Sequence, residues 1–548
     1  MNSYLSMSSN NIANALFRTL STDDSWRYCF LDKGGDGNET YLSSIELLKK
    51  SLSFAKKITK TIPHSSPIIL AFDHGIDLTI CLLACLFSGN TAVVAPVPRP
   101  GATFLRFKSL YEACDSAVVI TQDKNSDLLN HFFQSEGDSQ TIQVFKLENL
   151  ETLTPQYPTE QLRGFKLAVD ETVILQFTSG STSTPKGISI SSCNILANQA
   201  KIAESWQCKP GSTYLFWLPL YHDMGLFGML AQLLSGLKIV QMDPLQFSKK
   251  PIRWLRAISK FNVYCSGGPP FAYALCNELE PEQIPNDLNL SHWKIAFCGA
   301  DFVPAEVLAK FRDKFKPFHL NYNSVIPVYG LAEATLFVAG QPSKSSEQFI
   351  CPSNKTEGCY LGAENSSVRI FEVEGKKELP QGEIGEICFE GESVAKGYVG
   401  ATSHTESFLR TGDLGYIEND YLYICDRIKD IIIYNGISLS PSSIEQSASS
   451  VHSAINSSAV AAFQDVNGIH LLIEVRNSKQ QITLDYSALK SQIRDEVRRQ
   501  TGVFLSTIRF LRRGQLMRTT SGKIQRKKIA IHFEKGHEFR EVESVKSM

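Results

Sequence analysis

Short apolar runs that favour β-strands alternate with amphipathic segments that favour α-helices along most of the chain. The amphipathic segments include 43–59 and 306–315. Continuous apolar strands separated by helices are typical of parallel sheets that helices cover on both faces. The sequence therefore predicts an α/β fold. The apolar runs are 67–72 (PIILAF), 92–97 (AVVAPV), 116–121 (SAVVIT), 173–178 (VILQFT), 262–267 (NVYCSG) and 294–299 (KIAFCG).

The pattern changes from about Gly358 onward. Short β-type runs with closely spaced turn residues follow, as in 382–391 and 420–434, and they indicate a smaller β-rich subdomain. After Pro441 come a helix start, a strand-like run and a long helical pattern at 489–502. We expect a separate α+β domain at the carboxyl end.

The charge balance also changes sign late in the chain. The whole chain carries 55 Lys and Arg against 56 Asp and Glu, which argues against a nucleic-acid-binding protein. From Asp426 to the end there are 19 basic and 12 acidic residues, against 36 and 44 before it. We place a domain boundary there, giving domains at 1–427 and 428–548. The basic excess suits an anionic partner, although a solvated helical face is the commoner reading of such a bias.

The cysteines and the amino terminus bear on location. The 13 cysteines contain no CxxC pair, and the closest two are Cys81 and Cys85. This scatter is typical of reduced, buried thiols and not of a disulfide framework or a zinc site. The first residues lack the basic and apolar regions of a secretory signal, and the most apolar stretch, 78–87, is too short to span a bilayer. We expect a cytoplasmic protein without integral membrane association.

The strongest local signal is LQFTSGSTSTPKG at 175–187. An apolar strand runs into a segment dense in Ser, Thr and Gly, and a helix-like stretch follows. Exposed backbone amides, hydroxyls and Lys186 would form a cradle for phosphate oxygens. The segment is not a Walker loop, because Pro185 stands where the second glycine belongs and Gly187 replaces the Ser or Thr after the lysine. The alternative is a polar surface turn.

Four later segments contain residues suited to nucleotide chemistry. PVYGLAEAT at 327–335 places an aromatic ring, a glycine and a carboxylate together. RTGDLG at 410–415 puts Asp413 in an expected tight turn, and a predicted strand carries Arg427. A glycine-containing loop near the carboxyl terminus holds Lys523. Each segment alone is more typical of a structural role, but together, in this order, they are much more specific.

These segments identify a resemblance that covers nearly the whole chain. The sequence resembles the adenylate-forming superfamily of acyl-CoA synthetases, luciferases and nonribosomal adenylation domains, and within it the fatty acyl-AMP ligases. YHDMGL, at 221–226, is the most diagnostic part. The distinguishing segments are PVPRPG (96–101), WLPLYHDMGLFG (217–228), GGPPFAYALC (267–276), WKIAFCGADFVPAE (293–306) and YGLAEATLFVAG (329–340).

The resemblance implies a fold, the use of ATP and Mg²⁺, and a loop that binds phosphate groups. The expected fold has a large N-terminal domain of two mixed α/β sheet subdomains and a small β-rich subdomain, followed by a small mobile C-terminal domain. ATP would be the nucleotide, and Thr178 and Glu333 would hold Mg²⁺. The loop from Thr178 to Gly187 would hold the β- and γ-phosphates. Its expected binding residues are Thr178, Ser179, Gly180, Ser181, Thr182 and Lys186.

The adenosine is expected to contact two further motifs. By resemblance, Tyr329 stacks on adenine, beside Gly299, Ala300 and Gly330. Asp413 holds the ribose hydroxyls.

The resemblance also assigns catalytic residues. Lys523 would bridge the fatty carboxylate and the α-phosphate, and a point charge on a flexible stem suits a group that moves with its domain. Arg427 would assist near the ribose and phosphate. Without the earlier motifs, Lys523 would be read as a solvated lysine.

His222 is expected at the acyl site. A carboxylate that is already ionised needs no general base, so we expect a positioning role or, equally, a structural histidine. The apolar stretch after it, 224–237, is either a wall of an acyl tunnel or ordinary core.

Activation without release requires an acceptor. The resemblance implies transfer to an acyl carrier protein in trans, after the C-terminal domain rotates about a hinge near Lys429. A basic domain would favour encounter with an acidic carrier protein. The sequence departs from the family at Ser183, where glycine is common, and at 341–357, where fatty acyl-AMP ligases usually carry a longer insertion.

The short 341–357 segment keeps a fatty acyl-CoA synthetase open as the alternative. A catalytically silent relative would lack Lys523, Glu333 or Asp413, and all three are present. A nonribosomal amino-acid adenylation domain would need an acidic residue for the α-ammonium group, and we find no clear candidate.

Overall fold

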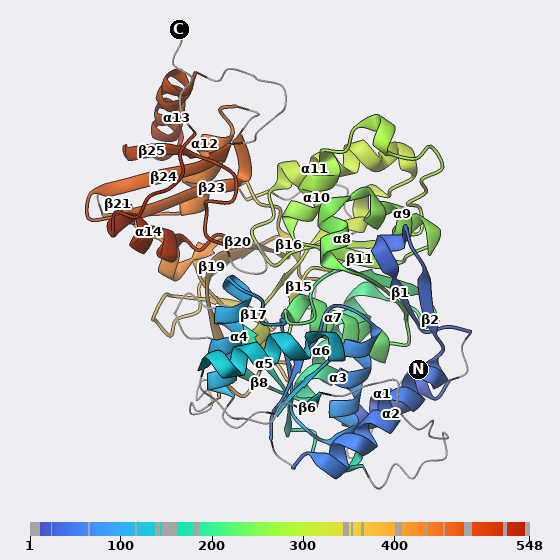
Figure 1. Ribbon diagram of the computed structural model, residues 1–548. Helices are drawn as coiled ribbons and strands as arrows, with labels where there is room; N and C mark the ends of the chain where they lie inside the picture. Colours follow the sequence, from blue (N-terminus) through green and yellow to red (C-terminus); the bar gives the residue numbers. More distant parts are fainter. Residues whose placement is uncertain are drawn as a thin grey trace. The chain divides into compact units, whose positions relative to one another are not determined.

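In the computed structural model (Figure 1) the chain forms two compact units. The first unit comprises 1–347, 359–368 and 389–409, and the second comprises 348–358, 369–388 and 410–548. The predicted boundary at residue 428 stays a prediction. The described residues are 11–22, 25–63, 66–114, 118–136, 143–144, 162–178, 186–343, 350–351, 355–362, 367–399, 408–434, 436–452, 455–475, 485–518 and 523–542.

The first unit contains a seven-stranded sheet in which every neighbouring pair is parallel except the last. The antiparallel pair joins β1 and β2 at one edge. This sheet confirms the prediction from the apolar runs. Its order is β13 (Val325–Pro327), β12 (Ile295–Cys298), β11 (Cys265–Gly268), β9 (Thr213–Phe216), β10 (Lys238–Met242), β1 (Tyr28–Leu31) and β2 (Glu39–Leu42).

A second, six-stranded sheet in the same unit ends in an antiparallel pair that carries the predicted phosphate loop. Its order is β6 (Gln143–Val144), β5 (Val118–Thr121), β3 (Ile68–Ala71), β4 (Ala92–Ala95), β7 (Thr172–Thr178) and β8 (Lys186–Ser191).

The phosphate loop does not lead directly into a helix. Strand β8 follows it, since Ile188 and Ile190 alternate with smaller residues and are buried. Helix α6 (Ser192–Trp206) begins only then, with Ser191 and Asn194 forming a capping box.

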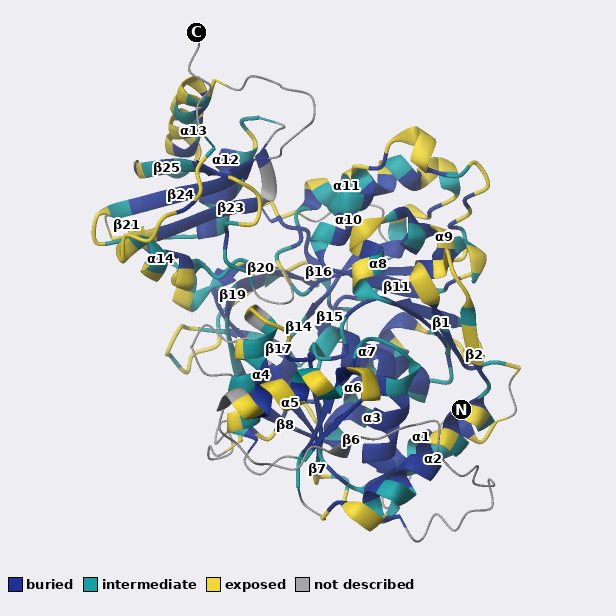
Figure 2. Cartoon of the chain, in the orientation of Figure 1, coloured by how far each residue is buried: buried dark blue, intermediate teal, exposed yellow. Residues whose placement is uncertain are grey.

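Both sheets are buried on two faces, as Figure 2 shows in dark blue. In β3, Ile68 and Leu70 belong to a core cluster that also holds residues of the other sheet, whereas Ile69 and Ala71 belong to a cluster with α4 (Ala102–Ala113) and α5 (Ser126–Glu136). The seven-stranded sheet repeats this: alternate residues of β9 and β12 face the shared cluster or a cluster with α9 (Ile252–Lys260) and α11 (Ala305–Phe315). Period-two alternation with both faces apolar explains the continuous apolar runs.

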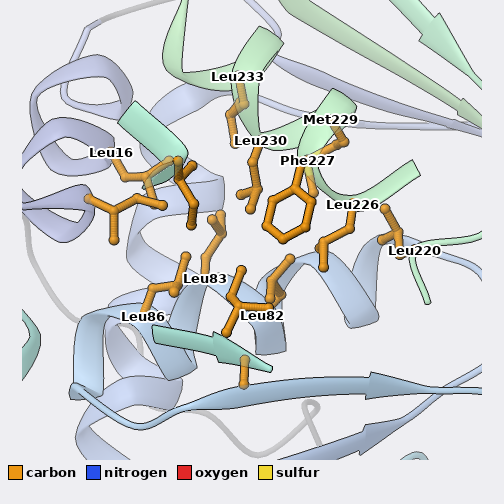
Figure 3. Close-up of a cluster of buried hydrophobic side chains, with 14 of the residues drawn as sticks. Leu16, Leu82, Leu83, Leu86, Leu220, Leu226, Phe227, Met229, Leu230 and Leu233 are labelled. Atoms are coloured by element: carbon orange, nitrogen blue, oxygen red, sulfur yellow. The ribbon is translucent and has the colours of Figure 1, made fainter. Parts of the chain in front are cut away.

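Helix α7 (Asp223–Leu234) lies within the shared cluster. Figure 3 shows Leu226, Phe227 and Leu230 of α7 near Leu82 and Leu83 of α3 (Ile76–Ser88). These side chains are almost fully buried. This face of the predicted tunnel-or-core segment is therefore packed core.

The second unit contains an antiparallel hairpin and a three-stranded sheet with one antiparallel and one parallel pair of strands. Strands β19 (Leu409–Glu418) and β20 (Tyr421–Arg427) form a hairpin. A three-stranded sheet follows, of β23 (Ile455–Asp465), β24 (Gly468–Val475) and β25 (Leu505–Leu511). Apolar residues of α12 (Pro441–Ser449) and α13 (Tyr486–Thr501) pack on one face, and Ile529 of α14 (Arg526–Glu534) packs with residues of the other. This is the expected α+β arrangement.

All 13 cysteines are free thiols, and only Cys193 and Cys208 are not fully buried, as their scatter predicted. Within the described part of the chain, no helix has both the length and the apolar character needed to cross a membrane.

Candidate functional site

Two neighbouring strand ends of the first unit carry the residues predicted to contact adenine. Gly299 and Ala300 follow β12, and Tyr329 follows β13. The strands are parallel neighbours, and the amide of Val328 donates a hydrogen bond to the carbonyl of Cys298 at 2.7 Å. The structure thus brings Gly299, Ala300 and Tyr329 to one edge of the sheet, the edge where open α/β sheets bind ligands.

The backbone at this edge leaves no room for larger residues. A Cβ on Gly299 would lie 2.5 Å from the carbonyl oxygen of Val328, and a Cβ on Gly330 would lie 1.9 Å from that of Leu336. Tyr329 and Gly330 form β14, which pairs with β15 (Phe337–Ala339). Glycine at these positions is a requirement of packing, because neighbouring main-chain atoms approach too closely for a Cβ.

Two residues at this edge have a backbone with a positive φ. Ala300 has a φ of 67°, and Thr335 has a φ of 68° although it is β-branched and buried. Such conformations cost about 1–3 kcal/mol each and persist where the surrounding structure fixes them, often at functional sites. The Thr335 hydroxyl donates to the carbonyl of Ser393 at 2.7 Å, which holds the turn. No sequence pattern had indicated this strain.

Glu333 and Lys186 are joined through Tyr398. The Tyr398 hydroxyl donates a hydrogen bond to Oε1 of Glu333 at 2.8 Å. The Nζ atom of Lys186 lies 5.2 Å from the centre of the Tyr398 ring, within the range of a cation–π interaction. Burial and the Glu333 carboxylate raise the pKa of the Tyr398 phenol well above its usual value, so the hydroxyl stays a donor. The predicted Mg²⁺ ligand and the phosphate-loop lysine therefore lie near one another.

The path of the chain around Tyr398 explains why Glu333 and Lys186 lie near one another. The amide of Val399 donates to the carbonyl of Gly187 at 2.8 Å, and the amide of Ala395 donates to that of Glu333 at 2.8 Å. The segment thus runs from the Glu333 turn to the edge of β8. Sequence reasoning missed Tyr398. Its signal was an aromatic residue after a glycine in KGYVG, at 396–400, which was not connected to any motif.

Only the ends of the predicted phosphate loop fall within the described residues. Thr178 ends β7, Lys186 begins β8, and the two are cross-strand partners. The loop is therefore closed at its base as a hairpin. Ser179, Gly180, Ser181 and Thr182, together with the departure at Ser183, lie outside the described residues.

The residues predicted to hold magnesium can be tested for fit. Mg²⁺ is usually bound through one or two carboxylates plus substrate phosphates and water. Glu333 is partly exposed, and its contact with Tyr398 fixes one carboxylate oxygen. The described residues contain no cluster of three or more His, Cys, Asp or Glu. A single carboxylate, oriented by Tyr398 and near Lys186, fits the octahedral type of site that substrate phosphates complete.

His222 lies at the start of α7, near the end of β7. Its carbonyl accepts the first helical hydrogen bond, from the amide of Leu226 at 2.9 Å, and its ring lies 4.9 Å from that of Tyr221. The carbonyl of Tyr221 accepts a hydrogen bond from Nε2 of Gln176, two residues before the end of β7, at 3.2 Å. This geometry places His222 near the phosphate-loop strand, and its acyl-site role stays a prediction.

Asp413 and Arg427 meet in the second unit. Their backbones are partners across the β19–β20 hairpin, and Nε of Arg427 lies 3.1 Å from Oδ1 of Asp413. The expected tight turn at Asp413 was wrong: the residue lies within a strand. Gly412 takes the positive φ of 73°, and a register shift between Leu414 and Gly415 absorbs the irregularity. The ion pair presents a buried carboxylate next to a half-exposed guanidinium.

Lys523 lies in a loop whose base is closed. Arg518 and Ile524 form an antiparallel bridge, and the amide of Gln525 donates to the carbonyl of Met517 at 2.9 Å. Lys523 is partly buried, next to this base. The second unit thus holds Asp413, Arg427 and Lys523, whereas the first holds the adenine and Mg²⁺ candidates.

Comparison with known families gives two matches. The family described as AMP-binding enzyme matches residues 26–399. The family described as Disco-interacting protein 2-like, AMP domain, matches residues 429–540. The first match alone spans more than half of the chain.

Individual relatives are similar over nearly their whole length. A medium-chain-fatty-acid–[acyl-carrier-protein] ligase, JamA of Moorena producens, is 29% identical over 93% of this chain and 92% of its own. A second such ligase, TtuA of Teredinibacter turnerae, is 28% identical over 93% and 91%. A solved structure from a study of fatty acyl-adenylate ligases of E. coli and L. pneumophila is 26% identical, with a TM-score of 0.81 over 96% of this chain and 98% of its own.

Proposed function

Because the chain belongs to the AMP-binding enzyme family, and within the adenylate-forming superfamily is a fatty acyl-AMP ligase, we propose that it activates a medium- or long-chain fatty acid with ATP and transfers the acyl group to an acyl carrier protein. In the first step a carboxylate oxygen attacks the α-phosphorus and pyrophosphate leaves. In the second, the phosphopantetheine sulfur attacks the acyl carbon and AMP leaves. The observation that carries the proposal is the near full-length similarity to a fatty-acid–[acyl-carrier-protein] ligase.

The residues of the first unit would bind the nucleotide by shape and by charge. Tyr329 offers a ring face to adenine beside the glycine-lined edge at Gly299. Lys186 and the amides of the 178–187 loop offer positive charge to the β- and γ-phosphates. Such positioning and charge neutralisation are the main protein contributions to reactions at phosphorus.

Mg²⁺ belongs to the same proposal. Thr178 and Glu333 would hold it, with Tyr398 fixing the Glu333 carboxylate through the 2.8 Å hydrogen bond. The bound ion would neutralise charge on the phosphate oxygens.

The second unit would supply the remaining charges. Asp413 would accept hydrogen bonds from two ribose hydroxyls, and Arg427 beside it would attract the phosphate. Lys523 would bridge the two anions that must meet, the fatty carboxylate and the α-phosphate. We place the mobile domain at 428–548 with the hinge near Lys429, and we propose a cytoplasmic location from the cysteine pattern.

A carrier protein is favoured over coenzyme A as the acceptor. The names of the two ligases described above specify an acyl carrier protein for those enzymes. The short 341–357 segment is the sequence feature that keeps coenzyme A open as the alternative acceptor. The experiment follows a labelled C12 acid with ATP and Mg²⁺, in the presence of no acceptor, coenzyme A, or an acyl carrier protein bearing phosphopantetheine.

The expected products separate the two acceptors. Acyl adenylate should accumulate without acceptor and with coenzyme A, and acyl thioester should form only with the carrier protein. Rapid formation of acyl-CoA would instead support the synthetase alternative, and formation of no adenylate in any tube would reject the proposed function.

A further inference from the structure

The first helical residue after the Lys523 loop makes a buried ion pair. Arg526 begins α14, three residues after Lys523, and its side chain is 15% exposed. Its Nε and one terminal nitrogen donate to the two carboxylate oxygens of Glu445, each at 2.7 Å. This two-bond geometry fixes the direction of the guanidinium plane as well as its position.

Glu445 is itself held on two sides. It lies on α12, and its Oε1 atom also accepts a hydrogen bond from the amide of Ala462 on β23 at 2.9 Å. Burial raises the pKa of the Glu445 carboxyl, and the Arg526 charge opposes that rise. The start of α14 is therefore tied to the sheet through one shared carboxylate.

The same guanidinium reaches the predicted hinge. A terminal nitrogen of Arg526 lies 3.9 Å from Oδ2 of Asp430, the residue after Lys429, in the 3-10 turn Ile428–Asp430. The neighbouring Asp426, at the end of β20, accepts hydrogen bonds from the amide of Arg427 and the hydroxyl of Ser440. Arg526 thus links the loop that bears Lys523 to the turn at which the domain is proposed to rotate.

The loop itself is short and closed at its base. The bridge between Arg518 and Ile524 and the hydrogen bond between Gln525 and Met517 fix both ends. Nothing flexible separates Lys523 from Arg526 in the sequence, since only Ile524 and Gln525 lie between them and both are paired. A shift of Arg526 would therefore move the backbone of Lys523.

We infer that Arg526 is a positioning residue for Lys523: its ion pairs to Glu445 and Asp430 hold the Lys523 loop in a fixed place relative to the hinge turn. The inference rests on the proposed catalytic role of Lys523. Arg526 touches no substrate in this scheme. It acts by keeping the Lys523 ammonium at a constant distance from the hinge when the domain rotates, and a displacement of about 1 Å at a reacting group costs up to about 100-fold in rate.

The test compares Arg526→Lys with a matched control, Arg499→Lys. Lysine keeps the charge but cannot make the planar two-bond contact. Arg499 forms a similar two-bond pair with Glu496 at 2.9 and 2.6 Å, in the same unit, but is 70% exposed. Arg526→Lys should lower kcat for acyl-adenylate formation about 10- to 100-fold. Arg499→Lys should leave it within about twofold, as expected for an exposed pair.

Three readouts separate positioning from a purely structural role. The KM for ATP should stay within about twofold in Arg526→Lys, and so should the rate of transfer from purified acyl adenylate to carrier protein, which does not use Lys523. Hydrogen exchange should rise at the amides of 523–526 and stay unchanged in β24. Equal loss in both half-reactions, or exchange raised throughout the unit, would overturn the inference.

A second variant distinguishes a loss of positioning from a loss of folding. Asp430→Asn leaves the Arg526–Glu445 pair in place and removes only the charge at the hinge turn, so we expect a smaller loss of kcat, about threefold to tenfold, at unchanged thermal stability. Full activity in both Arg526→Lys and Asp430→Asn would reject the inference. Full activity in Lys523→Ala would instead reject the role proposed for Lys523.

Discussion

The two units position their candidate residues by different means. In the first, Tyr329 and Gly330 are held by main-chain packing at the ends of buried strands, where an added Cβ would strike a carbonyl oxygen. In the second, Asp413 and Lys523 are held by the pairing of a hairpin and a loop base and by ion pairs. Under the proposed function, the first unit would recognise the nucleotide by shape, which tolerates no added atom. The second would supply charges, which neutralisation removes even where the size of the side chain is kept.

Removal of the proposed catalytic charge should produce the largest effect. Lys523→Ala should lower the rate of acyl-adenylate formation about 100- to 1000-fold, since one transition-state contact is lost. ATP binding, measured by calorimetry, should change little. Retention of more than about a tenth of the rate would contradict the assignment.

A single methyl group in the first unit should have nearly as large an effect. Gly330→Ala forces the Leu336 carbonyl to move and should destabilise the protein by about 1–3 kcal/mol. The turn beside Tyr329 would shift, so kcat/KM for ATP should fall about 100-fold. The control is Gly75→Ala, where the added Cβ meets nothing within 4 Å. Equal activities of the two variants would show that the close packing at Gly330 does not determine how ATP is bound.

Neutralisation of the Asp413 carboxylate in the second unit should have a moderate effect. Asp413→Asn keeps the size of the side chain but weakens a charged hydrogen bond worth about 1.5–3 kcal/mol, so the KM for ATP should rise about 10-fold or more. Asp420→Asn, at the exposed tip of the same hairpin, is the control. A KM that changes equally in both would show that Asp413 has no part in nucleotide binding.

The Tyr398 hydroxyl tests the Mg²⁺ proposal with a smaller change. Tyr398→Phe leaves the ring beside Lys186 but removes the hydrogen bond to Glu333. The Mg²⁺ concentration for half-maximal rate should rise about 10-fold, because residues that orient a metal ligand typically affect metal affinity by this factor. Tyr41→Phe, which loses a 2.6 Å bond to Glu39 on an edge strand, should show no shift. A normal Mg²⁺ requirement in Tyr398→Phe would count against Glu333 as a ligand.

Salt should have the smallest effect. If the basic charge of 428–548 guides an acidic carrier protein, the second-order rate of acyl transfer should fall about threefold between 50 and 500 mM NaCl. Acyl-adenylate formation should vary less. A transfer rate independent of salt would show that the charge excess is only a solvated surface.

The predicted parallel sheets are confirmed because their signal is local. Apolar runs such as 67–72 and 294–299 must be buried on both faces, and the structure alternates their residues between two clusters. The secondary structure at Asp413 could not be predicted from local residues in the same way. Its glycine neighbours predicted a turn, but pairing with β20, set by residues farther along the chain, makes a strand.

The contacts that complete the site are long-range, and the sequence did not reveal them. Tyr398 meets Glu333 across 65 residues, and Arg526 meets Glu445 across 81. Such pairs depend on how sheets and helices pack and not on spacing within a motif. The strained backbones at Ala300 and Thr335 could not be predicted from the sequence either, since neither residue type favours a positive φ.

Exchange of labelled pyrophosphate into ATP, measured for a C12 acid, a C16 acid and a mixture of amino acids, tests directly whether this protein adenylates fatty acids. Exchange should require Mg²⁺ and a fatty acid, and amino acids should not support it. Exchange driven by amino acids, or its absence with every fatty acid under conditions in which ATP binds, would contradict the conclusion that this protein adenylates fatty acids.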